Sequence, residues 1–217
     1  MSPFKGGSLR ERIMHDEEIV NVALVVFLRS LTVECDDLRP HCMWSPGRYA
    51  FRVCDRDGNK VYEARVDGAL CRRSNQGLGK WIFGIMEVKP FSRRANRTGI
   101  CMQEGAQMVA WVSQQPPKDL AEARKRPDHK FCRLLISQER HEVYLTFAVF
   151  DADCVDYIRG AVGATQLPST QGFMQMHEYG PFSTTTRSHM QGLGELVVAL
   201  CYQLSRGGEL RRMPSTD

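Results

Sequence analysis

The chain has 217 residues, of which 42% are hydrophobic and a quarter are charged, and this length and composition suit one soluble-type domain with a sizeable core. The formal net charge of +4 is compatible with a polyanionic partner but is too small to indicate one. The eight cysteines include no Cys-x-x-Cys pair, and the longest apolar run, Val22 to Leu28, is too short to span a bilayer. Because residues 1–16 also lack an apolar signal core, we expect a reduced intracellular protein of the cytoplasm or nucleus, with no membrane partner.

The N-terminal part of the chain predicts a long helix. Apolar residues repeat every three or four positions between Leu9 and Leu31, and Asp16 is a suitable N-cap for the stronger half. Glu18 lies near the start of the apolar face, which fits either a favourable charge in the first turn or a polar group directed into a site. We expect one domain over residues 14–206, between a flexible tail at 1–13 and a tail at 207–217.

The next segment predicts strands. Residues 34–46 read as irregular, and a strand at Tyr49–Val53 is followed by a turn and a returning strand at Lys60–Arg73. A third strand, Lys80–Val88, ends before Pro90, which has no N–H to donate to a ladder.

The second half of the chain alternates further helices and strands. The patterns predict a helix at residues 100–113, a short helix within 119–128, a hairpin of 131–137 with 142–150, a short helix from Asp151 to Gly160, a loop at 163–170, a strand at 173–179 and a final helix from about Ser188 to Gly207. This order indicates an α/β (α+β) domain, in which a central mixed β-sheet is flanked by helices.

An acid and a lysine stand two residues apart in an otherwise apolar strand. Glu87 and Lys89 therefore point to the same face, about twenty residues after another acid, Asp67. Two carboxylates from neighbouring strands, with the carbonyl of Val88, can bind one Mg²⁺ or Mn²⁺ ion, and a lysine beside it can orient water. The plainer reading is a turn at Asp67 and an exposed ion pair, but the apolar context of the strand favours chemistry.

Basic residues are clustered on either side of this pattern. Arg93, Arg94 and Arg97 follow the strand in a loop, and Arg72 and Arg73 precede it. Such groups suit a phosphate backbone, although a solvated loop explains Arg93, Arg94 and Arg97 equally well.

Asp67, the run Glu87-Val88-Lys89 and a following helix that carries Gln103 and Gln107 on one face together resemble the PD-(D/E)xK nuclease superfamily. The resemblance is greatest to the nuclease-like domains of this type in fungal proteins. It covers residues 14–206 and extends to three more stretches in the same order, at 18–32, 103–111 and 178–182. The chain departs from the family pattern at Val66, where the family has proline.

The resemblance implies a restriction-endonuclease-like core and divalent-metal-dependent hydrolysis of phosphodiester bonds. By position, Asp67, Glu87 and the Val88 carbonyl would hold Mg²⁺ or Mn²⁺, and Lys89 would orient the water. Glu18 would be the acid from the first helix and Gln103 the supporting polar residue. The nucleic-acid contacts would come from Arg72, Arg73, Arg93, Arg94, Arg97 and Gln107.

The sequence therefore leads to a main expectation and two alternatives. The main expectation is a magnesium-dependent nuclease that hydrolyses nucleic acid, DNA in the first instance. The first alternative is a non-catalytic nucleic-acid-binding or protein-interaction module on the same fold. The second is a structural domain in which Glu87 and Lys89 are merely paired. The choice between DNA and RNA, the mode of cutting and the oligomeric state stay open.

Overall fold

The computed structural model describes residues 9–74, 77–126, 128–160, 172–207 and 210. In chain order its elements are α1 (Leu9–Val33), β1 (Cys42–Ser45), β2 (Tyr49–Cys54), β3 (Lys60–Val66), β4 (Gly68–Ser74), β5 (Gly77–Lys89), the 3-10 turn η1 (Arg93–Ala95), α2 (Arg97–Gln114), α3 (Leu120–Ala123), β6 (Phe131–Glu139), β7 (Glu142–Phe150), α4 (Ala152–Ile158), β8 (Gln175–Ser183) and α5 (Arg187–Gly207).

Six of these strands form one mixed sheet in the order β1-β4-β5-β6-β7-β8. The central pair, β5 and β6, is parallel, and every other neighbouring pair is antiparallel. The chain can make the parallel pair because η1, α2 and α3 form a crossover between the two strands. Strands β2 and β3 form a separate antiparallel hairpin. The expected class, a mixed sheet flanked by helices, is therefore confirmed.

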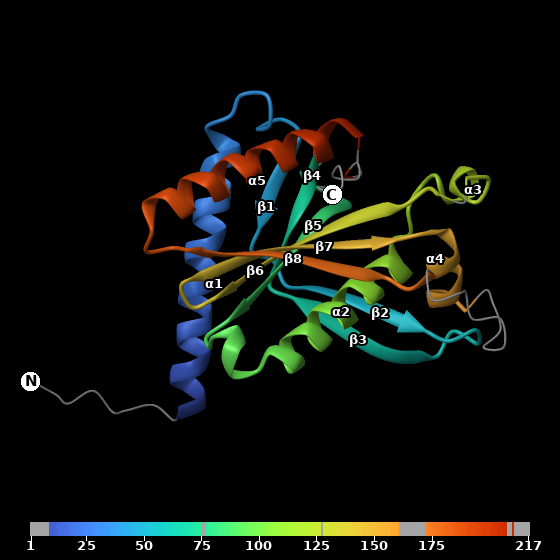
Figure 1. Ribbon diagram of the computed structural model, residues 1–217, viewed down its shortest axis with the longest axis horizontal. Coiled ribbons are helices and arrows are strands. Elements are labelled where there is room, and N and C mark those ends of the chain that lie inside the picture. Colours follow the sequence, from blue (N-terminus) through green and yellow to red (C-terminus); the bar gives the residue numbers. More distant parts are fainter. Residues whose placement is uncertain (1–8, 75–76, 127, 161–171, 208–209, 211–217) are drawn as a thin grey trace, which may run out of the picture.

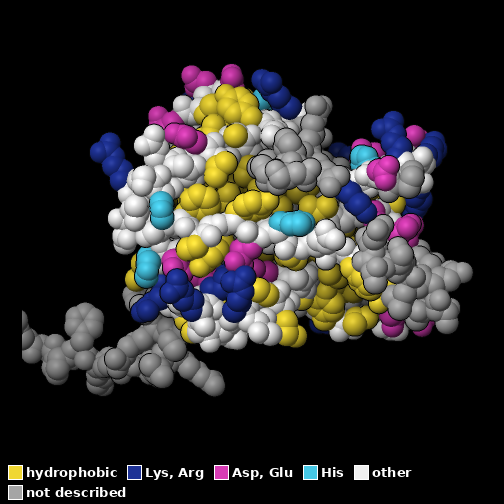
Figure 2. Space-filling model, viewed as in Figure 1, with side chains coloured by type: hydrophobic (Ala, Val, Ile, Leu, Met, Phe, Trp, Pro, Cys, Tyr) yellow, Lys and Arg dark blue, Asp and Glu magenta, His cyan; other side chains and the backbone are white. Residues whose placement is uncertain are grey.

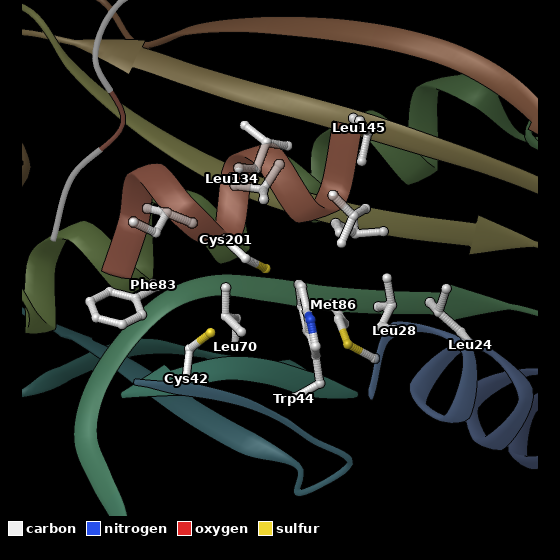
Figure 3. Packing of buried hydrophobic residues seen from close by; sticks show 14 of the residues in the cluster. Leu24, Leu28, Cys42, Trp44, Leu70, Phe83, Met86, Leu134, Leu145 and Cys201 are labelled. Carbon is white, nitrogen blue, oxygen red and sulfur yellow. The ribbon is translucent and has the colours of Figure 1, made fainter. Parts of the chain in front are cut away.

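Helices α1 and α5 pack against one face of the sheet (Figure 1). Their apolar residues meet alternate residues of the strands, because residues two apart on a strand share a face. Figure 3 shows Leu24 and Leu28 of α1 and Cys201 of α5 around Trp44, Leu70 and Met86, all of which are buried. This core fixes the orientation of α1 relative to β5.

Helix α2 and the β2–β3 hairpin cover the other face of the sheet (Figure 1). Trp111 of α2 lies 6.3 Å from Phe51 of β2, measured between ring centroids, and both are buried against Ile85 of β5. Because Ile85, Glu87 and Lys89 alternate with core residues of the α1 face, their side chains point toward α2. The sheet thus places Glu87 under α2.

Several predicted boundaries are wrong, and the most important lies in the segment Lys60–Arg73. It forms two strands in two different sheets, β3 and β4, which meet at Asp67. Strand β1 falls in a segment that was expected to be irregular, and β8 continues through the cis peptide bond between Gly180 and Pro181.

Helix α1 begins at Leu9, as the apolar periodicity predicts, and therefore includes residues 9–13 of the segment that was expected as a tail. The expected loop at 163–170 and the tail residues 1–8 and 211–217 lie outside the described residues. No helix among the described ranges is long and apolar enough to cross a membrane.

Candidate functional site

The site begins where β4 stops covering the edge of β5. The last cross-strand pair of β4 and β5 is Gly68 with Met86, and the backbone N–H of Asp67 donates to the Met86 carbonyl at 2.9 Å. Beyond this point the Val88 N–H donates to Oδ2 of Asp67 at 2.9 Å. A carboxylate therefore replaces the missing strand, and because the N–H and C=O of a strand residue point to the same side, the Val88 carbonyl also faces this opening.

Gly68 allows the chain to change sheets next to Asp67. A Cβ atom at this position would lie 2.6 Å from the backbone carbonyl oxygen of Ser45 in β1. The backbones of Gly68 and Ser45 cannot move apart to make room for it without breaking the β1–β4 pairing, in which Ser45 faces Ala69. The absence of a side chain at Gly68 is thus a condition for the position of Asp67.

Glu87 lies at the centre of the site, with only 3% of its surface exposed. Oε1 accepts a hydrogen bond from Nε2 of Gln103 at 2.5 Å and one from Nζ of Lys89. Oε2 accepts one from Nε2 of Gln107 at 2.6 Å, and the same nitrogen donates to the Arg65 carbonyl at 2.7 Å. Three donors thus fix the orientation of a carboxylate that is almost fully buried.

The two glutamines reach Glu87 because they lie four residues apart on α2 and so on the same face. The helix begins with a side-chain cap, in which Oδ1 of Asn96 accepts from the N–H of Gly99 at 3.2 Å. Of the two glutamines, one has the role that the sequence predicted and the other does not. Gln103 supports Glu87 as expected, but Gln107 is buried and binds Glu87 and backbone, so it does not face a nucleic acid.

The charges around Glu87 are unbalanced. Burial raises the pKa of Glu87 to about 7; Lys89 opposes this shift, and the nearby charge of Asp67 adds to it. Burial would lower the pKa of Lys89, but the charges of Glu87, Asp67 and Glu17 outweigh it and raise that pKa. Since the charge of Asp67 disfavours the ionised form of Glu87, an additional cation close to both would be stabilising.

Helix α1 contributes Glu17 to the site, since its charge acts on Lys89, whereas Glu18 is exposed. Partial burial raises the pKa of Glu17, and the charges of Lys89 and Asp67 also act on it. One turn further along, Nδ2 of Asn21 donates to the backbone carbonyl of Asp67 at 3.3 Å. The choice of Glu18 as the acid from this helix is therefore not supported by its position. The signal that was missed is that Glu17, Asn21, Leu24 and Leu28 share one face.

A further basic residue, Arg48, lies at the mouth of the site. Its Nε is 3.9 Å from Oδ1 of Asp67, and its side chain is 63% exposed. The sequence reasoning overlooked Arg48 because it stands alone in the turn between β1 and β2, about twenty residues before Asp67 along the chain.

Arg93 is not available to a nucleic acid, so its predicted role as a contact is wrong. The residue is only 1% exposed, and its guanidinium lies 2.5–3.2 Å from carboxylate oxygens of Glu104, Glu139 and Glu178. It also donates to Oγ of Ser137 at 3.0 Å and stacks on the ring of Tyr144 at 4.5 Å. We refer to Arg93, Glu104, Ser137, Glu139 and Glu178 as the Arg93 cluster.

The other predicted arginines fall into two groups. Arg94 in η1 and Arg97 at the start of α2 are exposed in a region where Figure 2 shows basic side chains gathered next to acidic ones, and Arg97 pairs with Glu178 at 3.2 Å. Arg72 and Arg73 lie at the far end of β4, roughly 15–20 Å from Asp67 at about 3.3 Å per residue. Arg73 there donates to the Arg39 carbonyl at 2.8 Å. Arg72 and Arg73 therefore do not flank the site.

The donor set suits a hard divalent cation in part. Within the described ranges there is no group of three or more His, Cys, Asp or Glu side chains arranged as a metal site. The expected set, however, needs only two carboxylates and the Val88 carbonyl. Beside Asp67, the buried Oδ1 of Asn21 has no hydrogen-bond donor among the described residues, and neither has Oε1 of Gln107 beside Glu87. Such free acceptors are compatible with the water shell that Mg²⁺ retains.

Comparisons with known proteins add no assignment: no family model, no curated protein and no solved structure matches the chain.

Proposed function

We propose that the protein is a metal-dependent nuclease of the PD-(D/E)xK type, with a restriction-endonuclease-like core, that hydrolyses phosphodiester bonds of nucleic acid, DNA in the first instance. The observation that carries this proposal is the buried carboxylate of Glu87, with a pKa of about 7, next to Asp67 and Lys89 at an open strand edge. Buried acids with strongly shifted pKa values are concentrated at functional sites, and Glu87 differs from a structural one by lying next to a second acid and a lysine where the pairing of β4 with β5 ends.

Asp67, Glu87 and the Val88 carbonyl would hold the Mg²⁺ or Mn²⁺ ion. When bound, such an ion acts as a Lewis acid toward the phosphate and lowers the pKa of the water molecule that it binds. Oxygen donors of this kind are what both metals require, and the repulsion between Asp67 and Glu87 favours occupancy.

The remaining residues have separate roles in this proposal. Gln103 and Gln107 keep the Glu87 carboxylate in one orientation. Lys89 donates hydrogen bonds from Nζ and can orient the attacking water or stabilise charge on the phosphate. Arg48, Arg94 and Arg97 are exposed cations that can bind the phosphate backbone. Glu17 adds a carboxylate on the α1 side.

A cleavage assay tests the proposal. The protein is incubated with supercoiled DNA, single-stranded DNA or RNA in the presence of Mg²⁺, Mn²⁺ or EDTA. We expect cutting with the metal ions and none with EDTA. Glu87→Gln and Lys89→Ala should each lower the rate at least about a hundredfold, since both remove groups that act at the reacting phosphate. Glu122→Gln, a change to an exposed glutamate of α3, is the matched control and should cut like the wild type.

Substitution of two adjacent acids in α1 tests the position of the site more specifically. Glu17→Gln should reduce cutting, whereas Glu18→Gln should not, because only Glu17 lies near Lys89 and Asp67. Metal-dependent cutting that survives Glu87→Gln would refute the site. Binding of nucleic acid in a gel-shift assay without any cutting would instead favour the non-catalytic module.

A further inference from the structure

Helix α1 has a second apolar face, opposite the one that packs on the sheet. Its inner side buries Leu24, Val25 and Leu28. On the outer side, four large apolar residues have between 41% and 61% of their surface exposed: Ile19, Val22, Val26 and Val33. A helix that is apolar on all sides is normally buried on all sides. The outer face of α1, in contrast, is not covered by any segment within the part of the chain that the structure describes.

Ile19, Val22 and Val26 form a continuous stripe, and Val33 lies two turns beyond Val26 on the same side, past the exposed Arg29 and Ser30. The spacings from Ile19 to Val22, Val26 and Val33 are three, seven and fourteen residues, so their side chains follow a single line along the helix. Figure 1 shows α1 at the edge of the molecule, beside the sheet and crossed by α5 only toward its C-terminal part. A stripe of this kind marks an interaction surface, whereas isolated exposed apolar residues do not.

Two opposite charges border the stripe on the same side. Glu18 and Arg29 are eleven residues apart, which is close to three full turns, so both lie along one edge of it. Both side chains are exposed, and neither forms an ion pair among the described residues, although Arg29 touches the sulfur of Met43 at 4.0 Å. The edge is thus negative at one end and positive at the other.

We infer that this stripe is the interface with a second copy of the chain, in which the two α1 helices pack antiparallel. A two-fold axis near residues 23–24 then brings Glu18 of each copy opposite Arg29 of the partner subunit, and brings Val22 and Val26 together at the centre. Parallel packing would instead place like charges opposite each other. The apolar stripe supplies the affinity, and the charges select the orientation.

One helix pair is a small interface, below the roughly 1,200 Å² that stable complexes bury, so the dimer is expected to be weak. Sedimentation velocity of the full chain from about 1 to about 200 µM should show a monomer–dimer equilibrium within that range. Val26→Glu should weaken association at least about tenfold, because it places a charge at the centre of the stripe. The matched control is Val61→Glu on β3, where the valine is 62% exposed against 61% for Val26, and it should associate like the wild type.

A charge-swap cycle tests the antiparallel orientation. Glu18→Arg and Arg29→Glu should each weaken association about threefold to tenfold, and the double variant should restore it, since opposite charges again face each other. A wild type that stays monomeric throughout the range, equal behaviour of Val26→Glu and Val61→Glu, or a double variant no better than the single ones would overturn the inference. None of these results depends on the nuclease activity, so the dimer and the proposed function stand or fall separately.

Discussion

Two buried polar clusters lie along helix α2, and they balance charge in opposite ways. In the Arg93 cluster the cation is in the centre, where the guanidinium binds Glu104 through two nitrogens and also reaches Glu139 and Glu178. Around Glu87 a carboxylate is in the centre, and its partners are one lysine, two neutral amides and a second acid nearby. Burial raises the pKa of both Glu87 and Glu139 to about 7.

The comparison separates structural from functional burial. The Arg93 cluster joins η1, α2, β6 and β8, and its arginine, Glu104 and Glu139 are almost fully buried. On the side of Asp67 the pairing of β5 with β4 ends at Gly68, and the exposed Arg48 lies next to the Asp67 carboxylate. In the Arg93 cluster the cation lies at the centre and joins the elements around it, which stabilises the fold, whereas a buried carboxylate with a second acid and only one lysine close to it is suited to bind a further cation.

The largest effect on stability is expected at Arg93. Arg93→Met should lower the free energy of unfolding by about 3–5 kcal/mol, because it leaves buried carboxylates without their partner. Arg94→Met, a change to the adjacent exposed arginine, should alter it by no more than about 0.5 kcal/mol. Chemical denaturation of both variants checks this, and equal stabilities would show that the Arg93 cluster is not what holds these elements together.

A pair of glycines tests the strand junction next. Gly68→Ala should lower the free energy of unfolding by about 2–4 kcal/mol and disturb Asp67, because the new Cβ would meet the Ser45 carbonyl. Gly105→Ala, within α2 and with no atom within 4 Å of an added Cβ, should raise it by up to about 1 kcal/mol through helix propensity. Thermal denaturation that gives both changes the same sign would contradict the packing described for Gly68.

The pH dependence of stability distinguishes Glu87 from its surroundings by a smaller effect. The native protein retains a proton on Glu87 up to a pKa of about 7, above the ordinary value of 4.5, so the stability this group contributes is present below pH 4.5 and is lost as the pH rises through about 7. In Glu87→Gln the free energy of unfolding should fall less with rising pH, by about 2–3 kcal/mol, since each pKa unit corresponds to about 1.36 kcal/mol. Glu139, whose pKa is also about 7, contributes equally in both proteins. Denaturant titrations at pH 5 and 8 measure the difference. An unchanged pH dependence would mean that Glu87 is not shifted.

The fold class was predictable because apolar periodicity reports which face of an element is buried. The convergence of Asp67, Glu87, Lys89 and Gln103 was also predictable, since strand alternation and helical spacing place them on facing surfaces. The division of Lys60–Arg73 was not, because both halves have strand character and only the pairing of β3 with β2 and of β4 with β1 and β5 shows the change of sheet.

The errors at the site have a common physical cause. Arg93 and Arg94 are adjacent residues of the same type, and the local sequence does not distinguish them. Only the tertiary contacts of Arg93 with β6 and β8 make it a buried structural residue. Glu17 and Glu18 are likewise adjacent acids, and the direction of each depends on how α1 is rotated against the sheet. Residue type and local pattern do not determine such a choice, because it is made by packing partners that are distant along the chain.

The most direct measurement of the central claim is the affinity of the site for a divalent cation. Isothermal titration of Mn²⁺ at pH 8 should give one ion per chain for the wild type, and Asp67→Asn and Glu87→Gln should each weaken binding at least about tenfold, since each removes one oxygen ligand. Arg94→Met should bind as the wild type does. Binding that is equally strong in Glu87→Gln, or absent in the wild type, would contradict the account.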